Sequence, residues 1–435
     1  MTDSREIYKT LDLALRVGEM LLSNGAGAPD VAATMGSIVH HLGLRGALID
    51  VTFVSLSISY QTSVEEPALL QTRHVTQRDL DYDDLTAVDH LVTALLLNEV
   101  DRDEARTRLA QIASSGHRTP RWAVTLGWGV IGAGVGMLLG GDWIVVLIAS
   151  VAAMGIEVMQ RYLSRRRFPF FYQQVAGGLL ATLLAIGVAA TDIPVDPSLV
   201  ITASIVMLLA GLGFIGAMQD ALSSFYITAG ARLLEVMIAT AGIIVGVSGG
   251  LSFGSVLGVD INLEPPVTQL SHLPVMTLGG AICAAAFAFS AYAPSRVLLP
   301  IAVISGVATA LYFVMTQHGF GQAWASAIAA VAIGVVSYTV AGWARVPPLV
   351  ILVSCIVPLL PGLSIYRALA LMADGDTAGV LALTTAAAIA ISLSSGVILG
   401  EYVAQPLKRE ARRLEQRLAG PRLVGPHRAR AVRKK

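Results

Sequence analysis

The feature that most constrains this chain is a nearly continuous series of apolar stretches that begins at Trp122 and runs to residue 403. A helix of about 20 apolar residues crosses the hydrocarbon core of a bilayer. We predict ten spans, with approximate bounds of 122–140, 143–160, 171–190, 199–220, 228–250, 275–293, 297–315, 323–343, 346–372 and 377–403. The chain is therefore expected to be a polytopic α-helical membrane protein.

The distribution of charge divides the chain into three regions. Only 14% of the 435 residues are charged, whereas about a quarter are charged in soluble domains. Residues 1–121 hold 11 basic and 17 acidic residues, residues 122–403 hold 8 and 11, and residues 404–435 hold 11 and 2. We expect an acidic soluble head, a membrane part and a basic tail.

Loop charges predict the orientation, because Lys and Arg accumulate on the cytoplasmic side. With a cytoplasmic head and ten spans, the inner loops contain Arg161, Arg165, Arg166, Arg167, Arg296 and Arg345. The outer loops contain no Lys or Arg, and their charged residues are Asp142, Asp192, Asp196, Asp260, Glu264, Asp374 and Asp376. We therefore expect a multi-pass protein of the cytoplasmic (inner) membrane with both termini in the cytoplasm.

The head combines two periodicities. Apolar residues recur at helical spacing up to Gly25 and again up to Gly43, then alternate with serines over residues 54–60 as in a half-buried strand, with 67–76 as its hairpin partner. Helical spacing returns from Leu85. We predict a cytoplasmic α+β domain at 1–120, a first membrane half at 121–250, a second at 274–404 and a basic cytoplasmic tail at 405–435.

A short internal echo relates the two membrane halves. Residues 209–212 (LAGL) precede an Ala-Gly pair at 229–230, and residues 360–363 (LPGL) precede one at 378–379. A repeat of five spans reverses its direction, and inverted repeats with interrupted helices are typical of secondary transporters. We predict two inverted five-helix repeats; the alternative is a chance match in Leu-, Ala- and Gly-rich sequence.

Proline and glycine predict interrupted helices. Pro361 and Gly362 lie in the middle of span 346–372, where proline removes a hydrogen-bond donor and clashes with the preceding turn. The half-helix that follows would offer free amide N–H groups, which suit a carboxylate. A kink with only a packing role is the alternative. Gly211 begins a glycine-rich stretch of span 199–220. We expect this span to be interrupted there as well, although it contains no proline.

Ionisable residues in apolar segments are costly and usually functional. Arg367 follows the Pro361-Gly362 break by little more than one helical turn, so it would clamp an anionic group. Asp220 and Arg232 flank a predicted turn, and Glu235 lies on the Arg232 face, so an acid here would bind an ammonium group or carry a coupling proton. A purely structural Arg232–Glu235 pair is the alternative.

Several chemistries lack candidate residues. No G-x-x-x-x-G-K-[ST] motif occurs, so we expect a gradient rather than ATP to drive any transport. Cys283 and Cys355 lack metal-site spacing, so we predict no metal and no other cofactor. Ser248 lies in a G-x-S-x-G match within an expected membrane helix, so we predict no catalytic residue and no enzyme. A membrane-embedded hydrolase and a passive pore remain the rival classes.

The sequence resembles the bacterial threonine/serine exporter family along nearly its whole length. Residues 13–26 look like that family's opening helix, and residues 50–53 with 57–60 look like its following strand. Residues 220–232 and 361–367 look like its first-half and second-half signatures. In some relatives the two halves are separate chains. The first-half break has no proline that corresponds to Pro361. The sequence therefore argues against a mechanism with two symmetric breaks.

The resemblance implies export of L-threonine and L-serine driven by the proton motive force, with dicarboxylate export, known in split relatives, as the alternative. The predicted substrate-binding residues are Gly211, Asp220, Arg232, Pro361, Gly362, Ser364 and Arg367. The predicted proton-coupling residues are Asp220 and Glu235. The expected partners are a small amino acid, protons and anionic lipids at the basic tail rather than nucleic acid; a homo-oligomer is compatible with the sequence.

Overall fold

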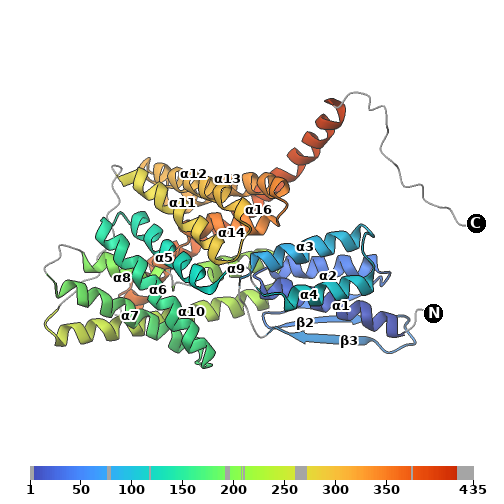
Figure 1. Ribbon diagram of the computed structural model, residues 1–435, viewed down its shortest axis with the longest axis horizontal. Helices are drawn as coiled ribbons and strands as arrows, with labels where there is room; N and C mark the ends of the chain where they lie inside the picture. Colours follow the sequence, from blue (N-terminus) through green and yellow to red (C-terminus); the bar gives the residue numbers. More distant parts are fainter. Residues whose placement is uncertain are drawn as a thin grey trace, which may run out of the picture.

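The computed structural model is mostly helical, with the head at one end of the molecule and the membrane part beside it (Figure 1). It describes residues 4–75, 80–116, 119–191, 196–206, 208, 211–259, 272–373 and 376–418. Four residues of the predicted outer loops, Asp192, Asp260, Glu264 and Asp374, lie outside this set, as does most of the predicted tail.

In the head, two helices pack on one face of a three-stranded antiparallel sheet, and two more helices pack on these (Figure 1). The helices are α1 (Ser4–Ser23), α2 (Ala28–His41), α3 (Tyr82–Leu96) and α4 (Arg102–Ser114), and the strands are β1 (Leu48–Val51), β2 (Ser55–Tyr60) and β3 (Leu69–His74). Strands β2 and β3 lie where the hairpin is predicted, and β1 is a third strand that the alternation did not reveal. Leu56 and Ile58 are fully buried because they face the helices.

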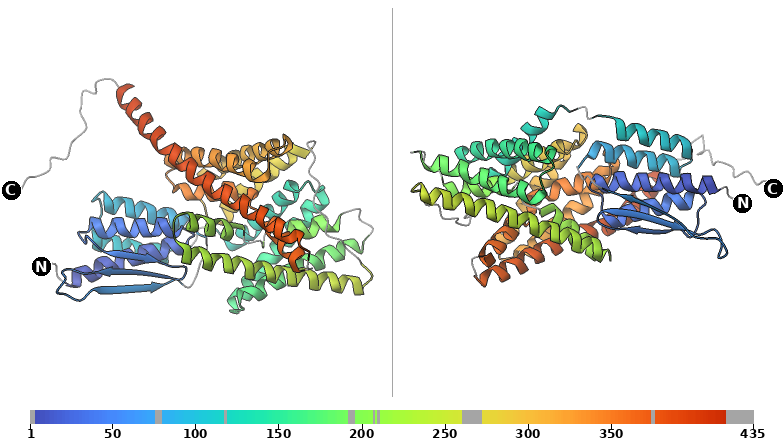
Figure 2. Two further views of the ribbon diagram at one scale, coloured as in Figure 1. Left: turned by 180° about the vertical axis from the view of Figure 1, so that it is seen from behind. Right: turned by 90° about the horizontal axis from the view of Figure 1, so that it is seen from below.

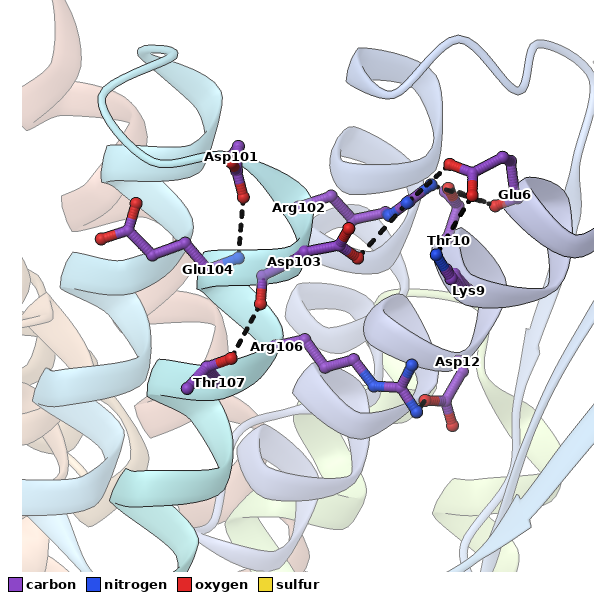
Figure 3. Close-up of polar contacts among 10 residues, drawn as sticks. All are labelled: Glu6, Lys9, Thr10, Asp12, Asp101, Arg102, Asp103, Glu104, Arg106 and Thr107. Atoms are coloured by element: carbon purple, nitrogen blue, oxygen red, sulfur yellow. Dashed lines mark hydrogen bonds and ion pairs between the residues drawn. The ribbon is translucent and has the colours of Figure 1, made fainter.

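Ion pairs join the first and last helices of the head (Figure 3). Arg102 and Arg106 lie one turn apart on α4 and reach Glu6 and Asp12 on α1, at 2.6 Å and 3.2 Å. Hydrogen bonds from Arg102 and Lys9 lower the pKa of Glu6. These pairs fix the orientation of α4 on α1 at the solvent-facing side of the head.

Among the described residues, seven helices are long and apolar enough to cross a membrane. They are α6 (Trp143–Arg165), α7 (Phe170–Ala189), α10 (Tyr226–Val256), α11 (Leu273–Ser290), η2 (Ser295–Val297) continuing into α12 (Leu298–Gln317), α13 (Gln322–Ala344) and α16 (Ala378–Leu418, apolar to Ala404). Two bent helix pairs raise the number to nine: α8 (Pro197–Val206) with α9 (Gly211–Leu222), and α14 (Pro348–Ile356) and η3 (Val357–Leu359) with α15 (Gly362–Ala373).

The remaining predicted span, 122–140, corresponds to α5 (Arg121–Leu138), which does not pass the same test. Arg121 and five glycines lower the mean hydropathy of this helix. Those glycines allow close packing instead: a side chain on Gly132 would collide with the backbone of Ala149 in α6. The structure therefore supports seven to nine spans, and the count of ten stays a prediction.

Helix pairings in the first half recur in the second. Helix α5 packs on α6, α6 on α7, and α7 on α10; in the same order α11 packs on α12, α12 on α13, and α13 on α16. The halves meet where α5 lies on α11, α9 on α16, and α10 on α15. Glycines permit close packing at corresponding places in the two halves, Gly178 and Gly246 between α7 and α10, and Gly396 and Gly400 between α13 and α16.

The head is packed directly onto the membrane part, and one continuous apolar core runs through both. Tyr82, the first residue of α3, is completely buried and meets Phe287 of α11 edge-on, with ring centroids 6.5 Å apart. Its backbone N–H donates to the Ala291 carbonyl at 2.8 Å. The head is thus held by buried contacts as well as by the chain connection to α5.

Candidate functional site

The predicted helix break at Pro361-Gly362 is present. Helix α14 ends at Ile356, a single 3-10 turn follows, and α15 starts at Gly362, with a bend of 46° between the two helices. Helices α8 and α9 are bent by the same 46° although no proline lies at their junction. The two breaks are therefore alike in angle despite their different sequences.

The two breaks meet inside the protein. Gly211, the first residue of α9, lies so close to Leu360 that a Cβ on the glycine would come within 2.9 Å of the Leu360 Cβ. Gly211, Pro361 and Gly362 are all buried. We call Gly211, Leu360, Pro361 and Gly362 the crossing.

Helix α15 begins at the crossing with amide groups that have no acceptor within the helix itself. The Ile365 N–H donates to the Pro361 carbonyl at 3.0 Å and closes the first helical hydrogen bond. The amides of Gly362, Leu363 and Ser364 therefore have no acceptor within the helix, and the positive end of the helix dipole lies there. Such an end is suited to a carboxylate group.

Arg367 lies five residues beyond Gly362, about 7.5 Å along the helix. Its side chain is half-buried. In the part of the chain that the structure describes, no carboxylate forms an ion pair with it. A buried guanidinium needs a partner to offset its desolvation, so Arg367 offers a positive charge near the crossing that an anionic group would satisfy.

Asp220 and Arg232, which flank the predicted turn, are brought together in the structure. Asp220 ends up fully buried near the end of α9, and Arg232 Nε on α10 lies 3.0 Å from its Oδ2. Gly216 makes room for the guanidinium, because a Cβ there would come within 2.4 Å of Arg232 Nη1. Glu235 is exposed, so the alternative of an Arg232–Glu235 pair does not describe this site.

Asp220 also binds the head. The backbone N–H of Ala28, the first residue of α2, donates to Asp220 Oδ1 at 3.2 Å. Gly27 precedes α2 and has no side chain to cap it, so Asp220 takes the place of a capping residue from a distant part of the chain. We call Ala28, Asp220 and Arg232 the latch.

Two further carboxylates approach the latch. Partial desolvation by the surrounding protein, followed by the negative charges of Glu401 and Asp220, raises the pKa of Asp30 in the first turn of α2. Asp30 remains accessible to water at the edge of this contact, while Glu401 of α16 lies beside Tyr338 of α13. Asp30 lies in the first turn of α2 and Glu401 lies within α16, and neither position in the sequence reveals this tertiary contact.

The crossing and the latch are separate places. Asp220 lies nine residues beyond Gly211, about 14 Å along α9. One small amino acid therefore does not reach both at once. Within the described residues no cluster of His, Cys, Asp and Glu side chains is arranged to hold a metal ion, and Ser248 lies exposed in the middle of α10 rather than at a strand-to-helix turn.

Comparison with known proteins decides the family. A family model for threonine/serine exporters matches residues 12–254, and a second, described as threonine/serine exporter, ThrE, matches residues 276–403. The chain belongs to the threonine/serine exporter family. Together the two matches cover the head, both breaks and both membrane halves of this exporter-family protein. The boundary between the matches lies where α10 ends and α11 begins.

Curated relatives of this threonine/serine exporter family member carry the same name. A protein of Mycobacterium tuberculosis (strain ATCC 25618 / H37Rv) named "Probable threonine/serine exporter" is 33% identical, with 96% of this chain and 81% of that protein covered. The "Threonine/serine exporter" of Corynebacterium glutamicum is 31% identical, with 95% and 86% covered. No solved structure matches the chain.

These findings describe a multi-pass protein of the bacterial cell membrane. The names of the family and the relatives indicate a transporter of small amino acids rather than an enzyme.

Proposed function

We propose that this protein exports L-threonine and L-serine across the cytoplasmic membrane, driven by the proton motive force, with both termini in the cytoplasm. The observation that carries the proposal is the crossing of two bent helices, within a chain whose relatives are named for this export. Discontinuous helices that meet at the middle of a membrane protein are characteristic of secondary transporters.

The proposed membrane core is a pair of inverted five-span repeats, in which α5 is the first span and brings the number to ten. The recurrence of the α5–α10 pairings in α11–α16 supports this arrangement. Two equal bends at matching positions support it as well. Each break would then open one half-helix towards the crossing from opposite sides of the membrane.

The proposed substrate site is the crossing with Ser364 and Arg367. The free amides of α15 and the Arg367 guanidinium would bind the substrate carboxylate, since a guanidinium offers two parallel donors to it. Gly211 keeps the two half-helices close because it has no side chain. Arg232 would bind the substrate only after the ion pair between Arg232 and Asp220 is broken.

Asp220 is the proposed proton carrier, with Glu235 as a second one near the surface of α10. A proton on Asp220 would weaken both its ion pair with Arg232 and its hydrogen bond from Ala28. Proton binding would in this way weaken the attachment of the head. This would happen when the substrate site changes the side of the membrane to which it is open. The latch thereby couples the proton to the position of the head.

Flux of labelled threonine in proteoliposomes tests the proposal. Saturable threonine movement that stops when an ionophore collapses the proton gradient is the expected result. Movement that does not saturate would indicate a pore, chemical change of threonine would indicate a hydrolase, and preference for a dicarboxylate would indicate the alternative substrate class. Asp220→Asn should retain threonine binding and lose the dependence on the gradient.

A further inference from the structure

A pocket of about 550 Å³ lies on the surface of α5 and α6, and none of its lining residues belongs to the crossing or the latch. Helix α5 starts here and α6 ends here, so the pocket lies at one end of this helix pair. Its lining residues are Arg121, Trp122, Thr125, Leu126, Arg161 and Arg165. Three arginines and an indole thus surround one open space.

The charges of this pocket are only partly neutralised. Glu157 lies 3.1 Å from Arg161 and accepts a hydrogen bond from Thr125 at 2.9 Å, so it is bound to one side of the pocket. Arg121 and Arg165 form no ion pair with any residue that the structure describes. The pocket therefore keeps an excess of positive charge, carried by two guanidinium groups suited to a phosphate.

An apolar stripe leads away from the pocket along the same helix pair. On α5, Trp122, Leu126 and Val130 follow one another at four-residue spacing and are 68%, 50% and 46% exposed. On α6, Val158 and Tyr162 are also exposed. Large apolar side chains this open belong next to lipid chains, and Trp is enriched at the level of the headgroups.

We propose that this pocket is a binding site for an anionic phospholipid. The headgroup phosphate would lie between Arg121 and Arg165, Trp122 would mark the interface, and an acyl chain would follow the Leu126–Val130 stripe. Basic pockets between membrane helices bind anionic lipid headgroups in this way. The site is distinct from the basic tail, and it does not depend on the transport mechanism.

The test measures lipid bound to the full-length protein. Wild-type protein and the Arg121→Gln/Arg165→Gln variant are purified from nanodiscs containing equal phosphatidylglycerol and phosphatidylcholine, and retained lipid is counted by mass spectrometry. We expect wild-type protein to retain phosphatidylglycerol preferentially. The variant should lose about 30-fold in affinity, since it lacks two cations that each contribute on the order of 1 kcal/mol.

A matched control removes the same charge beside the pocket. Arg166 and Arg167 follow directly on Arg165 but do not line the pocket, so Arg166→Gln/Arg167→Gln should retain the lipid. Equal loss in both variants, or no preference for phosphatidylglycerol in the wild-type protein, would overturn the proposal. So would displacement by millimolar inorganic phosphate, which would indicate a site for the free ion. Melting temperatures show that each variant is folded, and Arg121→Lys/Arg165→Lys should keep most of the binding.

Discussion

Asp220 Oδ1 accepts a hydrogen bond from the backbone N–H of Ala28 at 3.2 Å, and this bond joins residues 192 positions apart. The same carboxylate holds Arg232. A negative charge at the start of α2 is also stabilised by the dipole of that helix. The head therefore contributes directly to the surroundings of a buried charge in the membrane part (Figures 1 and 2), where α9 and α10 reach towards it.

The first prediction concerns the latch. Arg232→Gln leaves the buried carboxylate of Asp220 without its cation, so the variant should lose about 3–5 kcal/mol of stability, as is usual when one partner of a buried pair is removed. Thermal unfolding in detergent measures this loss. Arg108→Gln, which breaks the exposed pair with Glu104 in the head, is the control and should cost less than about 1 kcal/mol. Equal effects would show that Arg232 is solvated.

The second prediction tests the Asp220–Arg232 pair through a substitution at a neighbouring glycine. Gly216→Ala leaves Asp220 and Arg232 intact but places a methyl group where Arg232 Nη1 lies. The guanidinium has to move, so this variant should reproduce the main effects of Arg232→Gln. Gly230→Ala on α10, which would meet no atom within 4 Å, should be neutral or slightly stabilising. A well-behaved Gly216→Ala protein would mean that the pair tolerates displacement.

The third prediction is a pH dependence. Partial desolvation and the charges of Glu401 and Asp220 raise the pKa of Asp30 above its ordinary value of 3.8. The folded protein therefore binds this proton more tightly than the unfolded chain, so the contribution of Asp30 to stability falls as pH rises from 3.8 through the folded pKa. Asp30→Asn should abolish this loss of stability. The measurement is the change in melting temperature between pH 4 and pH 8. Asp103→Asn on the exposed face of α4 should leave it unchanged.

Sequence reasoning recovered what depends on local pattern. Pro361 in an apolar stretch predicts a broken helix, and alternation around Leu56 predicts a strand, because proline geometry and side-chain periodicity act within a few residues. Arg232 and Asp220 were also marked, since charge in an apolar segment stands out. These signals need no knowledge of the tertiary fold.

The tertiary contacts between the head and the membrane part could not be predicted from the sequence. Tyr82 of the head is buried against Phe287 of the membrane part, and Asp220 caps the helix that begins at Ala28. A tyrosine at a helix start and a glycine at a capping position look the same whether the partner is water or another helix. The bend before Gly211 has no proline, so its match to the bend before Gly362 emerges only in three dimensions.

The fourth prediction tests how the head is held. Tyr82→Ala removes a fully buried ring at the junction with α11, and truncations of buried aromatic residues cost about 3–5 kcal/mol. Protease should then cut between α4 and α5 more rapidly, as judged by release of a head fragment. Tyr8→Ala removes the same side chain from a site that is 44% exposed and should leave cleavage unchanged. Release at the wild-type rate would show that the other contacts suffice.

The fifth prediction tests the proposed substrate site. Arg367→Ala removes the half-buried cation next to the crossing, and loss of one partner of a buried charged pair typically costs about 2–5 kcal/mol. Threonine affinity should therefore fall roughly 30-fold to several thousand-fold. Arg367→Lys keeps the charge but loses the two parallel donors, so it should be impaired less.

The measurement that decides this prediction is threonine affinity per folded molecule, with expression and melting temperature recorded for each variant. Arg296→Ala serves as the matched control, because Arg296 lies in η2, outside the crossing, and donates to the backbone carbonyl of Arg345. A role confined to helix packing would lower the yield of folded Arg367→Ala protein and leave the affinity of the surviving molecules unchanged. Normal threonine affinity in well-folded Arg367→Ala protein would therefore remove Arg367 from the site and leave the carboxylate to the amides of α15 or to Arg232.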